Sequence, residues 1–299
     1  MQLGLVNVKG LRALRASASY LGQHPVFRAA PFVTLLRLAS WRLRSLAGGT
    51  VSVALETWKV TLLVPGRWRG TGKLIYVFRD QCDPDLKILS LFLKPGAVFI
   101  DVGAHLGIYS AIAGRLVGER GSVFAFEPGE EIFGLLEKNI KLNRLTNVKT
   151  FRTALADRTG SISLYHHPDP SRDSLGRPSD HDVSVALAED VPVARLDDVL
   201  RQSDAERIDL VKIDVEGAEE LVLRGAEALI TQTRPKVLFE INPAAAASLG
   251  LAADGAWRLL ENWGYCFHRL TAEQLRPLQS PPDGVQNVLA IQSEDKRAR

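Results

Sequence analysis

The sequence predicts an α/β fold built on an open, mostly parallel β-sheet that helices cover on both faces. From Gly96 onward, short apolar runs alternate with segments of helical spacing, the pattern of repeated strand–helix–strand units. The chain has 299 residues, 46% of them hydrophobic, and only 2 cysteines, so it can build a large core without disulfides. Collagen-like, disordered and disulfide-stapled classes of protein are excluded.

Residues 1–80 are predicted to form a basic extension, separate from a sheet domain at residues 81–299. They contain 12 Lys and Arg residues and only two acids, Glu56 and Asp80, whereas the whole chain has a net charge of +3. Such a segment suits an anionic lipid or a phosphorylated substrate, or it forms a solvated basic face. Its aromatic residues do not follow a pattern of single-strand binding, so no nucleic-acid partner is expected.

Residues 1–50 are predicted to be helical, with Gly48 and Gly49 as the stop signal. Helical spacing places a set of apolar side chains on one face: Phe32, Leu35, Leu36, Ala39 and Leu43. A basic amphipathic helix of this kind either makes a peripheral contact with a membrane or packs on the neighbouring domain. Both alternatives stay open.

The chain is expected to be cytoplasmic, with residues 1–50 as a candidate contact with the inner face of the membrane. No apolar run reaches the roughly 18–20 residues that a membrane-spanning helix needs. Lys9, Arg12 and Arg15 are spread through the start of the chain, whereas a signal peptide separates a basic start from an unbroken apolar core, so secretion is not expected. Cys82 and Cys266 form no CxxC pair, which fits a reduced compartment.

The elements follow in order along the chain. The segments 50–65 and 72–80 are predicted to be short strands joined by the turn at 66–70. Further strands are predicted at 97–103, 122–128, 148–155, 209–217, 235–242, 265–270 and 287–292. Helices are predicted at 108–118, 130–143, 218–230 and 255–264, and the polar segment 165–182 is a long surface loop.

Ligands of such sheets bind where the parallel strands end, so the polar residues there are the first candidates. Asp101 ends one strand, and Gly103 and Gly107 permit a tight turn and a close approach of the helix that follows. His105 lies between the glycines, so the segment is not the GxGxxG of a dinucleotide site. Asp101 suits the cationic end of an amino-acid-like ligand.

Glu127 ends the next strand after this glycine turn. A carboxylate at this place accepts hydrogen bonds from both hydroxyls of a ribose. The glycine turn and the acid together favour a ligand that contains a nucleoside.

Asp214 and Glu216 end a third apolar strand. Two carboxylates at this edge of the sheet can bind a divalent cation or remove a proton from a substrate hydroxyl. The alternative is that one of them caps the helix that starts near Gly217.

Four segments together resemble one known family: DVGAHLG, FAFEP, KNIKLNRLTNV and DLVKIDVEGAEELVLRGA. They are similar, in order and at fitting distances, to the FkbM family of S-adenosylmethionine-dependent methyltransferases, from about Gly96 to Ile291. The resemblance implies a class I methyltransferase (Rossmann-like) sheet of seven strands, with the last strand antiparallel. It also implies O-methylation of a hydroxyl on a sugar, a glycan or a natural product.

By motif position, the resemblance assigns roles to particular residues. Asp214 and Glu216 would be catalytic, and they are also the candidate ligands of a Mg²⁺ ion. The base could instead come from the long loop, which carries His166, His167 and His181. The residues that would contact S-adenosylmethionine are Asp101, Gly103, Ala104, His105, Gly107, Glu127, for the ribose, and Asp157, for the adenine edge.

Three other functions compete with this prediction. A nicotinamide-dependent oxidoreductase would need the GxGxxG that the chain lacks. A non-catalytic scaffold in a glycan-assembly complex could keep the cofactor fold. A methyltransferase could also act on a small molecule that is not a carbohydrate, because fold and cofactor do not identify the acceptor. The expected partner is therefore a small-molecule or glycan acceptor, with the oligomeric state open.

Overall fold

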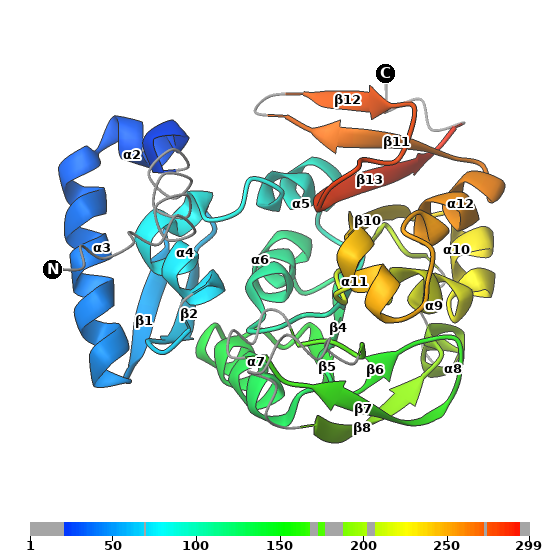
Figure 1. The fold of residues 1–299 in the computed structure, drawn as a ribbon, viewed down its shortest axis with the longest axis horizontal. Coiled ribbons are helices and arrows are strands. Elements are labelled where there is room, and N and C mark those ends of the chain that lie inside the picture. Colours follow the sequence, from blue (N-terminus) through cyan, green and yellow to red (C-terminus); the bar gives the residue numbers. More distant parts are fainter. Residues whose placement is uncertain are drawn as a thin grey trace, which may run out of the picture.

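A central sheet of eight strands organises the molecule (Figure 1). The computed structural model describes residues 21–68, 70–167, 173–176, 188–201, 207–271 and 274–293. The strand order across the sheet is β12-β11-β13-β10-β9-β3-β4-β5. The bounds are β3 Val98–Val102, β4 Ser122–Phe126, β5 Val148–Phe151, β9 Leu210–Ile213, β10 Lys236–Ile241, β11 Tyr265–Leu270, β12 Leu275–Leu278 and β13 Gln286–Gln292.

The sheet has a parallel core and antiparallel strands at one end. Strands β5, β4, β3, β9 and β10 run parallel, and β13, the last strand of the chain, runs antiparallel to β10 and β11. This confirms the predicted Rossmann-like α/β class with an antiparallel last strand. The count of seven strands was wrong by one, because β12 adds an eighth strand at the edge of the sheet, where it pairs antiparallel with β11. A four-residue edge strand that contains Pro277 carries little strand signal in a sequence.

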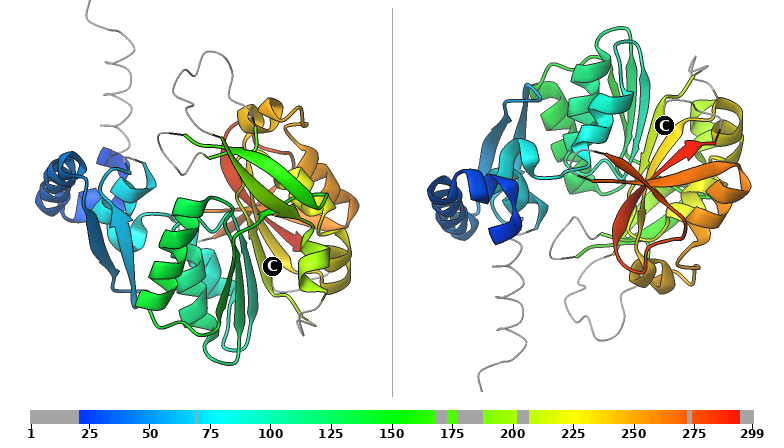
Figure 2. Two further views of the ribbon diagram at one scale, coloured as in Figure 1. Left: turned by 90° about the horizontal axis from the view of Figure 1, so that it is seen from below. Right: turned by 90° about the horizontal axis from the view of Figure 1, so that it is seen from above.

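Helices cover both faces of this sheet (Figure 2). Successive side chains of a strand point to opposite faces, so Phe99 joins one hydrophobic cluster and Ile100 joins the other. The first cluster includes α5 Leu86–Phe92, α6 Ile108–Val117 and α7 Glu130–Leu142. The second includes α8 Leu196–Leu200, α9 Glu219–Arg224, α10 Glu227–Thr233 and α12 Gly255–Asn262, while α11 spans Pro243–Ser248. Burial on both faces explains why these strands read as continuous apolar runs.

The helix predicted at 218–230 is two helices, α9 and α10. Gly225 ends α9, and a Cβ placed on it would overlap the carbonyl oxygen of Ala156. Because the backbones pass so closely, only glycine fits there, and the chain turns between the two helices. Helical spacing alone does not reveal a break that is set by Ala156, which lies in a distant part of the sequence.

The N-terminal segment contains α2 Pro25–Ala29, α3 Pro31–Ala47, the hairpin of β1 Thr50–Leu55 and β2 Val60–Pro65, α4 Thr71–Phe78 and the short 3₁₀ turn Arg79–Gln81. The predicted strand at 72–80 was wrong, because this run forms α4. Its residues Ile75–Phe78 are buried in succession, and a short apolar run buried on all sides does not distinguish strand from helix. The predicted helix appears as α2 and α3 in the described residues, while residues 1–20 lie outside them.

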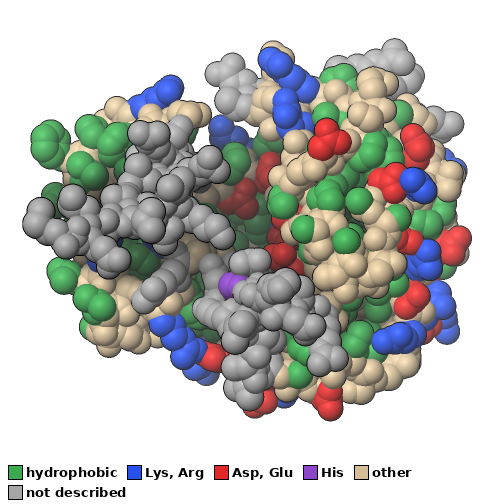
Figure 3. Space-filling model, viewed as in Figure 1, with side chains coloured by type: hydrophobic (Ala, Val, Ile, Leu, Met, Phe, Trp, Pro, Cys, Tyr) green, Lys and Arg blue, Asp and Glu red, His purple; other side chains and the backbone are tan. Residues whose placement is uncertain are grey.

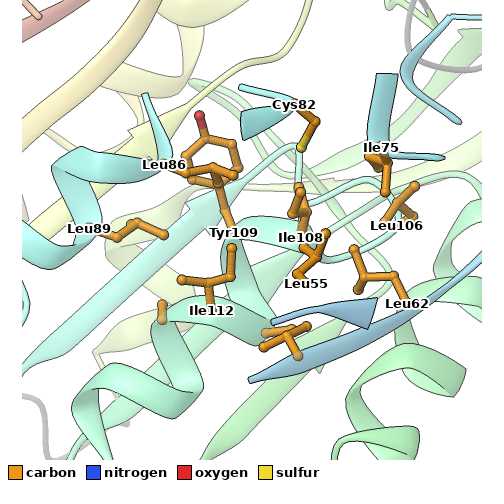
Figure 4. Packing of buried hydrophobic residues seen from close by; sticks show 14 of the residues in the cluster. Leu55, Leu62, Ile75, Cys82, Leu86, Leu89, Leu106, Ile108, Tyr109 and Ile112 are labelled. Carbon is orange, nitrogen blue, oxygen red and sulfur yellow. The ribbon is translucent and has the colours of Figure 1, made fainter. Parts of the chain in front are cut away.

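Side chains of the N-terminal hairpin and of the helices that cover the sheet form one hydrophobic cluster (Figure 4). Leu55 and Leu62 of the hairpin belong to the same cluster as Leu86 of α5 and Ile108 and Ile112 of α6. The hairpin therefore packs directly on the helices that cover the sheet. The division into domains at residue 80 stays a prediction.

The predicted apolar face of α3 does not pack on the rest of the molecule. Phe32, Leu36 and Leu43 are 82%, 71% and 69% exposed. This face therefore makes no packing contact of its own, and α3 packs on α4 through the opposite face, where Thr34 and Trp41 are buried. Across the part of the chain that the structure describes, no helix has the length and apolar character to span a membrane.

A second, small sheet stands beside the carboxyl ends of the central strands. It contains β6 Ala154–Leu155, β8 Ala188–Ala194 and β7 Gly160–Tyr165, in the order β6-β8-β7. The predicted strand at 148–155 is thus divided between two sheets, β5 in the large one and β6 in the small one. The division matters for the site, because Ala154, Leu155 and Leu164 face the cavity described next.

Candidate active site

A cavity of about 200 Å³ opens at the carboxyl ends of β3, β4 and β9. The chain leaves β3 in one direction to form β4 and later returns on its other side to form β9, so this edge is the switch point of the sheet. Four groups of residues line the cavity: the loop after β3, the residues after β4 and β9, the small sheet, and Thr71 with Asp83 from the N-terminal part.

The loop after β3 brings the backbone close to the cavity. Gly103, His105 and Gly107 all have positive φ, at 77°, 50° and 89°. A Cβ on Gly103 would overlap the carbonyl oxygen of Asp214, so the loops after β3 and β9 touch at a position that only glycine allows. Gly103, Ala104 and His105 line the cavity, whereas Gly107, which precedes α6, does not.

Glu127 lies buried at the end of β4 and lines the cavity. Its Oε2 accepts a hydrogen bond from the N–H of His105 at 2.9 Å, and its Oε1 accepts one from the N–H of Gly129 at 3.0 Å. Burial raises the pKa of Glu127 to about 7, although both hydrogen bonds lower it. A carboxylate has about four lone-pair sites, so Glu127 can still accept hydrogen bonds from a ligand.

His105 joins this loop to the N-terminal segment. Its ring lies against the indole of Trp68, with 4.8 Å between the ring centroids. A non-glycine residue at positive φ is strained by roughly 1–2 kcal/mol, which the contact with Trp68 and the hydrogen bond to Glu127 offset. The place of His105 in the site thus depends on residues before position 80.

Asp101 is buried beneath the cavity and does not line it. Its Oδ2 accepts a hydrogen bond from the hydroxyl of Ser110 at 2.6 Å, and its Oδ1 lies 3.8 Å from Nζ of Lys212. The structure does not bring Asp101 to the place where the cationic end of a ligand was expected to meet it.

Lys212 is a site residue that sequence reasoning missed. Its Nζ lies 3.1 Å from Oδ2 of Asp214 and 4.8 Å from the ring centre of Tyr109, and its side chain is 5% exposed. Burial lowers the pKa of Lys212, but Asp214 and Asp101 outweigh it, so the net shift is upward and the group stays cationic. Its position two residues before Asp214 on a strand was the available signal, because such residues share a face.

Asp214 and Glu216 both line the cavity, as their motif predicts, and they approach a third acid, Glu240. Oxygens of the three carboxylates lie within 4.8 Å of one another. Asn242 donates to Glu240 at 3.2 Å and to Glu216 at 3.5 Å. Burial, together with the charge of Asp214, raises the pKa of Glu240 to about 7. Oxygen ligands of this kind can hold a divalent cation or accept hydrogen bonds from hydroxyls.

The alternative that Asp214 or Glu216 caps a helix was wrong. Helix α9 begins at Glu219, and no side chain caps it. Oε1 of Glu219 instead accepts hydrogen bonds from the N–H groups of Val215 and Gly217, at 3.0 and 3.3 Å. Glu219 fixes the loop, which leaves the carboxylates of Asp214 and Glu216 facing the cavity.

Asp83 and Tyr109 form a further part of the cavity wall that the sequence did not reveal. The hydroxyl of Tyr109 donates a hydrogen bond to Oδ2 of Asp83 at 2.7 Å. Nearby, burial, together with the charge of Asp83, raises the pKa of Asp85 to about 6. Asp83 lies three residues beyond the predicted strand at 72–80 and not at its end, so no strand-end pattern in the sequence marks it.

The remaining candidates lie away from the cavity or outside the described residues. Asp157 follows β6, beside Gly225, and does not line the cavity. Nδ1 of His166 lies 2.7 Å from Asp173, and its Nε2 lies 3.3 Å from Glu189. His166 and His167 line a separate hollow next to Trp68. The prediction for His181 falls outside the described residues.

Acidic groups dominate the cavity. Figure 3 shows acidic side chains gathered in the hollow between the N-terminal segment and the sheet domain. Among the described residues that line the cavity, Lys212 is the one Lys or Arg, while five are acidic: Asp83, Glu127, Asp173, Asp214 and Glu216. Such a lining attracts hydroxyl donors and cations and repels anions.

Residues 101–267 match the family model described as a methyltransferase FkbM domain, which is more than half of the chain. Three curated proteins are among those that are similar to this chain. Methyltransferase sdnD of Sordaria araneosa is 30% identical over 178 residues, and 2-O-methyltransferase NoeI of Sinorhizobium fredii is 30% identical over 163 residues. Hexuronic acid methyltransferase AglP of Haloferax volcanii is 27% identical over 176 residues.

These alignments cover only part of each protein. They include 50% of this chain and 66% of sdnD, 50% and 65% for NoeI, and 59% and 62% for AglP. The chain thus spans slightly less than two thirds of the length of these relatives. All the motif residues discussed above lie within residues 101–267, the part that the family model matches.

Proposed function

Because this chain belongs to the FkbM family of S-adenosylmethionine-dependent methyltransferases, we propose that it transfers the methyl group of that cofactor to a hydroxyl oxygen of a sugar or glycan. One observation carries the proposal: Glu127, a ribose-binding type of acid, and Asp214, a candidate base, line the same cavity at the switch point of the sheet. The family match concerns residues 101–267, and we propose this activity for the whole chain.

The lining of the cavity fits S-adenosylmethionine. Glu127 would accept hydrogen bonds from the ribose hydroxyls, and the backbone of Gly103–His105 would pass beside the amino-acid part. Phe126, Ile132 and Leu155 offer apolar surface to a base. When bound, the cofactor supplies a methyl group that its sulfonium already activates. The acidic residues that follow the strands at this cavity suit the cationic amino group of the cofactor.

Asp214 and Glu216 would bind the acceptor and take the proton from its hydroxyl. A sugar hydroxyl is a weak nucleophile until its proton is removed, so a carboxylate within hydrogen-bond reach accelerates the transfer. Lys212, held between Asp101 and Asp214, fixes the orientation of the Asp214 carboxylate. The wall of Tyr109 and Asp83 closes the other side and helps to exclude water.

The name of one relative supports an oxygen acceptor, and the name of another supports a sugar. NoeI is named a 2-O-methyltransferase and AglP a hexuronic acid methyltransferase. The acidic cluster of Asp214, Glu216 and Glu240 favours a neutral acceptor, because a uronate would meet repulsion there. A small molecule that is not a carbohydrate and a non-catalytic scaffold in a glycan-assembly complex remain the alternatives that experiments must separate.

Calorimetric titration with S-adenosylmethionine and, separately, with NADH tests the cofactor. We expect micromolar binding of the first and none of the second. Glu127→Ala should abolish binding, whereas Glu137→Ala, which removes an exposed acid on α7, should leave it intact. Failure of the wild-type chain to bind S-adenosylmethionine would favour the scaffold.

Transfer of labelled methyl groups to a panel of neutral sugars, uronates and amino sugars tests the chemistry. Asp214→Asn should remove turnover on the best acceptor while leaving cofactor binding largely intact. Near-normal turnover in this variant would show that Asp214 is not the base.

A chelator distinguishes the two roles of the acidic cluster. If Asp214, Glu216 and Glu240 hold Mg²⁺, EDTA abolishes the transfer and added Mg²⁺ restores it. If they bind acceptor hydroxyls directly, the transfer proceeds unchanged in EDTA.

A further inference from the structure

One face of α3 is fixed to the body of the molecule. Trp41 is 3% exposed and Thr34 is fully buried. Nη1 of Arg37 donates a hydrogen bond to the carbonyl oxygen of Val77 at 3.1 Å, and the hydroxyl groups of Ser40 and Tyr76 lie 3.1 Å apart. These contacts hold α3 against α4, so the helix cannot rotate its opposite face inward.

The opposite face of α3 is a bare apolar stripe. We define the α3 stripe as Phe32, Leu35, Leu36, Leu43 and Leu46, which are 82%, 49%, 71%, 69% and 84% exposed. At 100° per residue they occupy an arc of about 100° along the 17-residue helix. Figure 3 shows hydrophobic side chains gathered along the edge of the molecule over α3. Monomeric proteins rarely leave such a contiguous patch without a partner.

The charge around the stripe indicates what covers it. The part of the chain before Glu56 contains seven Lys and Arg residues and no Asp or Glu. Arg42 follows Leu35 by two helical turns, so it borders the stripe, and it is exposed, as is Arg28 on α2. An apolar stripe with a basic border matches the boundary between the acyl chains and the anionic headgroups of a bilayer.

We propose that α3 docks this protein on an anionic lipid bilayer, lying in the plane of the interface with the α3 stripe in the acyl boundary. The helix is roughly 25 Å long, and its buried face keeps it attached to α4 while the stripe enters the lipid. A second copy of the chain fits the stripe less well. Two stripes face to face would bring basic segments together, and the sequence before Glu56 has no acid to neutralise them. The proposal does not depend on methyl transfer.

Co-sedimentation of the full chain with vesicles tests the proposal. The probe is phosphatidylcholine and phosphatidylglycerol in a three-to-one ratio, at low salt, compared with phosphatidylcholine alone. We expect the chain to bind the mixed vesicles, and we expect this binding to weaken when salt is added. Binding to vesicles of phosphatidylcholine alone should be weaker. Leu43→Glu should lower the partition about tenfold or more, because it removes a leucine from the acyl boundary and adds a charge.

Val285→Glu is the matched control, because Val285 is 64% exposed but lies before β13, away from α3. It should bind like the wild-type chain, and thermal unfolding should show that both variants stay folded. Three results would overturn the proposal: a wild-type chain that does not sediment with the mixed vesicles, equal binding by Leu43→Glu, or a wild-type dimer that Leu43→Glu converts to monomer without any vesicle binding.

Discussion

At the scale of single residues, Glu127 has to satisfy two demands. It is buried, which favours the protonated carboxyl, yet hydrogen bonds from two backbone N–H groups favour the carboxylate. The outcome in the ligand-free chain is a pKa of about 7, so the group changes charge near neutral pH. The state of this one proton therefore sets how well the cavity accepts hydroxyl donors.

We predict that the affinity for S-adenosylmethionine falls as the pH is lowered below about 7. Protonation of Glu127 removes an acceptor that the ribose hydroxyls use, so the affinity should approach a tenfold loss per pH unit at most. Titration calorimetry at several pH values measures the profile. Glu127→Gln should bind weakly with a flat profile, and a steep profile in that variant would assign the titration to another group.

We predict that Gly103→Ala destabilises the chain much more than Gly118→Ala. Both glycines have positive φ, at 77° and 63°, so both substitutions cost about 1–2 kcal/mol of backbone strain. Only the Cβ at position 103 would also overlap a neighbour, the carbonyl oxygen of Asp214, while position 118 has open space. Thermal unfolding should show a clearly lower midpoint for Gly103→Ala. Equal midpoints would mean that the two loops separate easily.

At the scale of elements, two asparagine side chains at the end of α7 form hydrogen bonds to the free edge of the hairpin. Asn139 and Asn143 are buried, and each uses its amide to pair with both backbone groups of one residue of β2. Asn139 pairs with Leu63, with the N–H at 2.6 Å, and Asn143 pairs with Thr61, with the N–H at 2.8 Å. The two amides act as the missing neighbour strand, so the edge of β2 has no unpaired groups at these residues.

We predict that Asn139→Ala and Asn143→Ala each cost roughly 1–3 kcal/mol of stability, because each leaves part-buried backbone groups of β2 without a partner. Amide hydrogen exchange at Thr61 and Leu63 should become faster. Asn262→Ala, at an exposed position on α12, should change neither quantity. Unchanged exchange in the first two variants would mean that β1 alone holds the hairpin.

The sequence predicts elements well where burial is symmetric and contacts are local. Strands β3, β4, β9 and β10 read as apolar runs because helices cover both of their faces, and the acids at their ends marked Glu127 and Asp214. The helix α4 was missed because burial on all sides removes its periodicity. Asp83 was missed because its partner Tyr109 lies 26 residues away, and no local pattern encodes that contact.

At the scale of the whole molecule, basic and acidic groups are kept apart. The chain before Glu56 carries no acid, whereas five acids line the cavity together with Lys212. Burial raises the pKa of Glu127 and Glu240 to about 7 and that of Glu219 to about 8. A site ready for hydroxyl donors thus contains several carboxyls that the fold holds partly protonated.

We predict that the ligand-free chain loses stability as the pH rises from about 6.5 to about 8.5. The three carboxyls have a higher pKa folded than unfolded, so the folded state binds more protons in this window and each proton lost on raising the pH weakens it. The slope is at most about 1.4 kcal/mol per pH unit for each group. His24 and His268 have lowered pKa values because of burial, so they are already neutral in this window.

Urea unfolding at pH values of about 6.5 and about 8.5 measures the change in stability. Glu219→Gln keeps an oxygen for the N–H groups of Val215 and Gly217, so it should flatten the slope, while the exposed Glu261→Gln should not. A wild-type stability that is constant or rises across the window would mean that these carboxyls are already ionised in the folded chain.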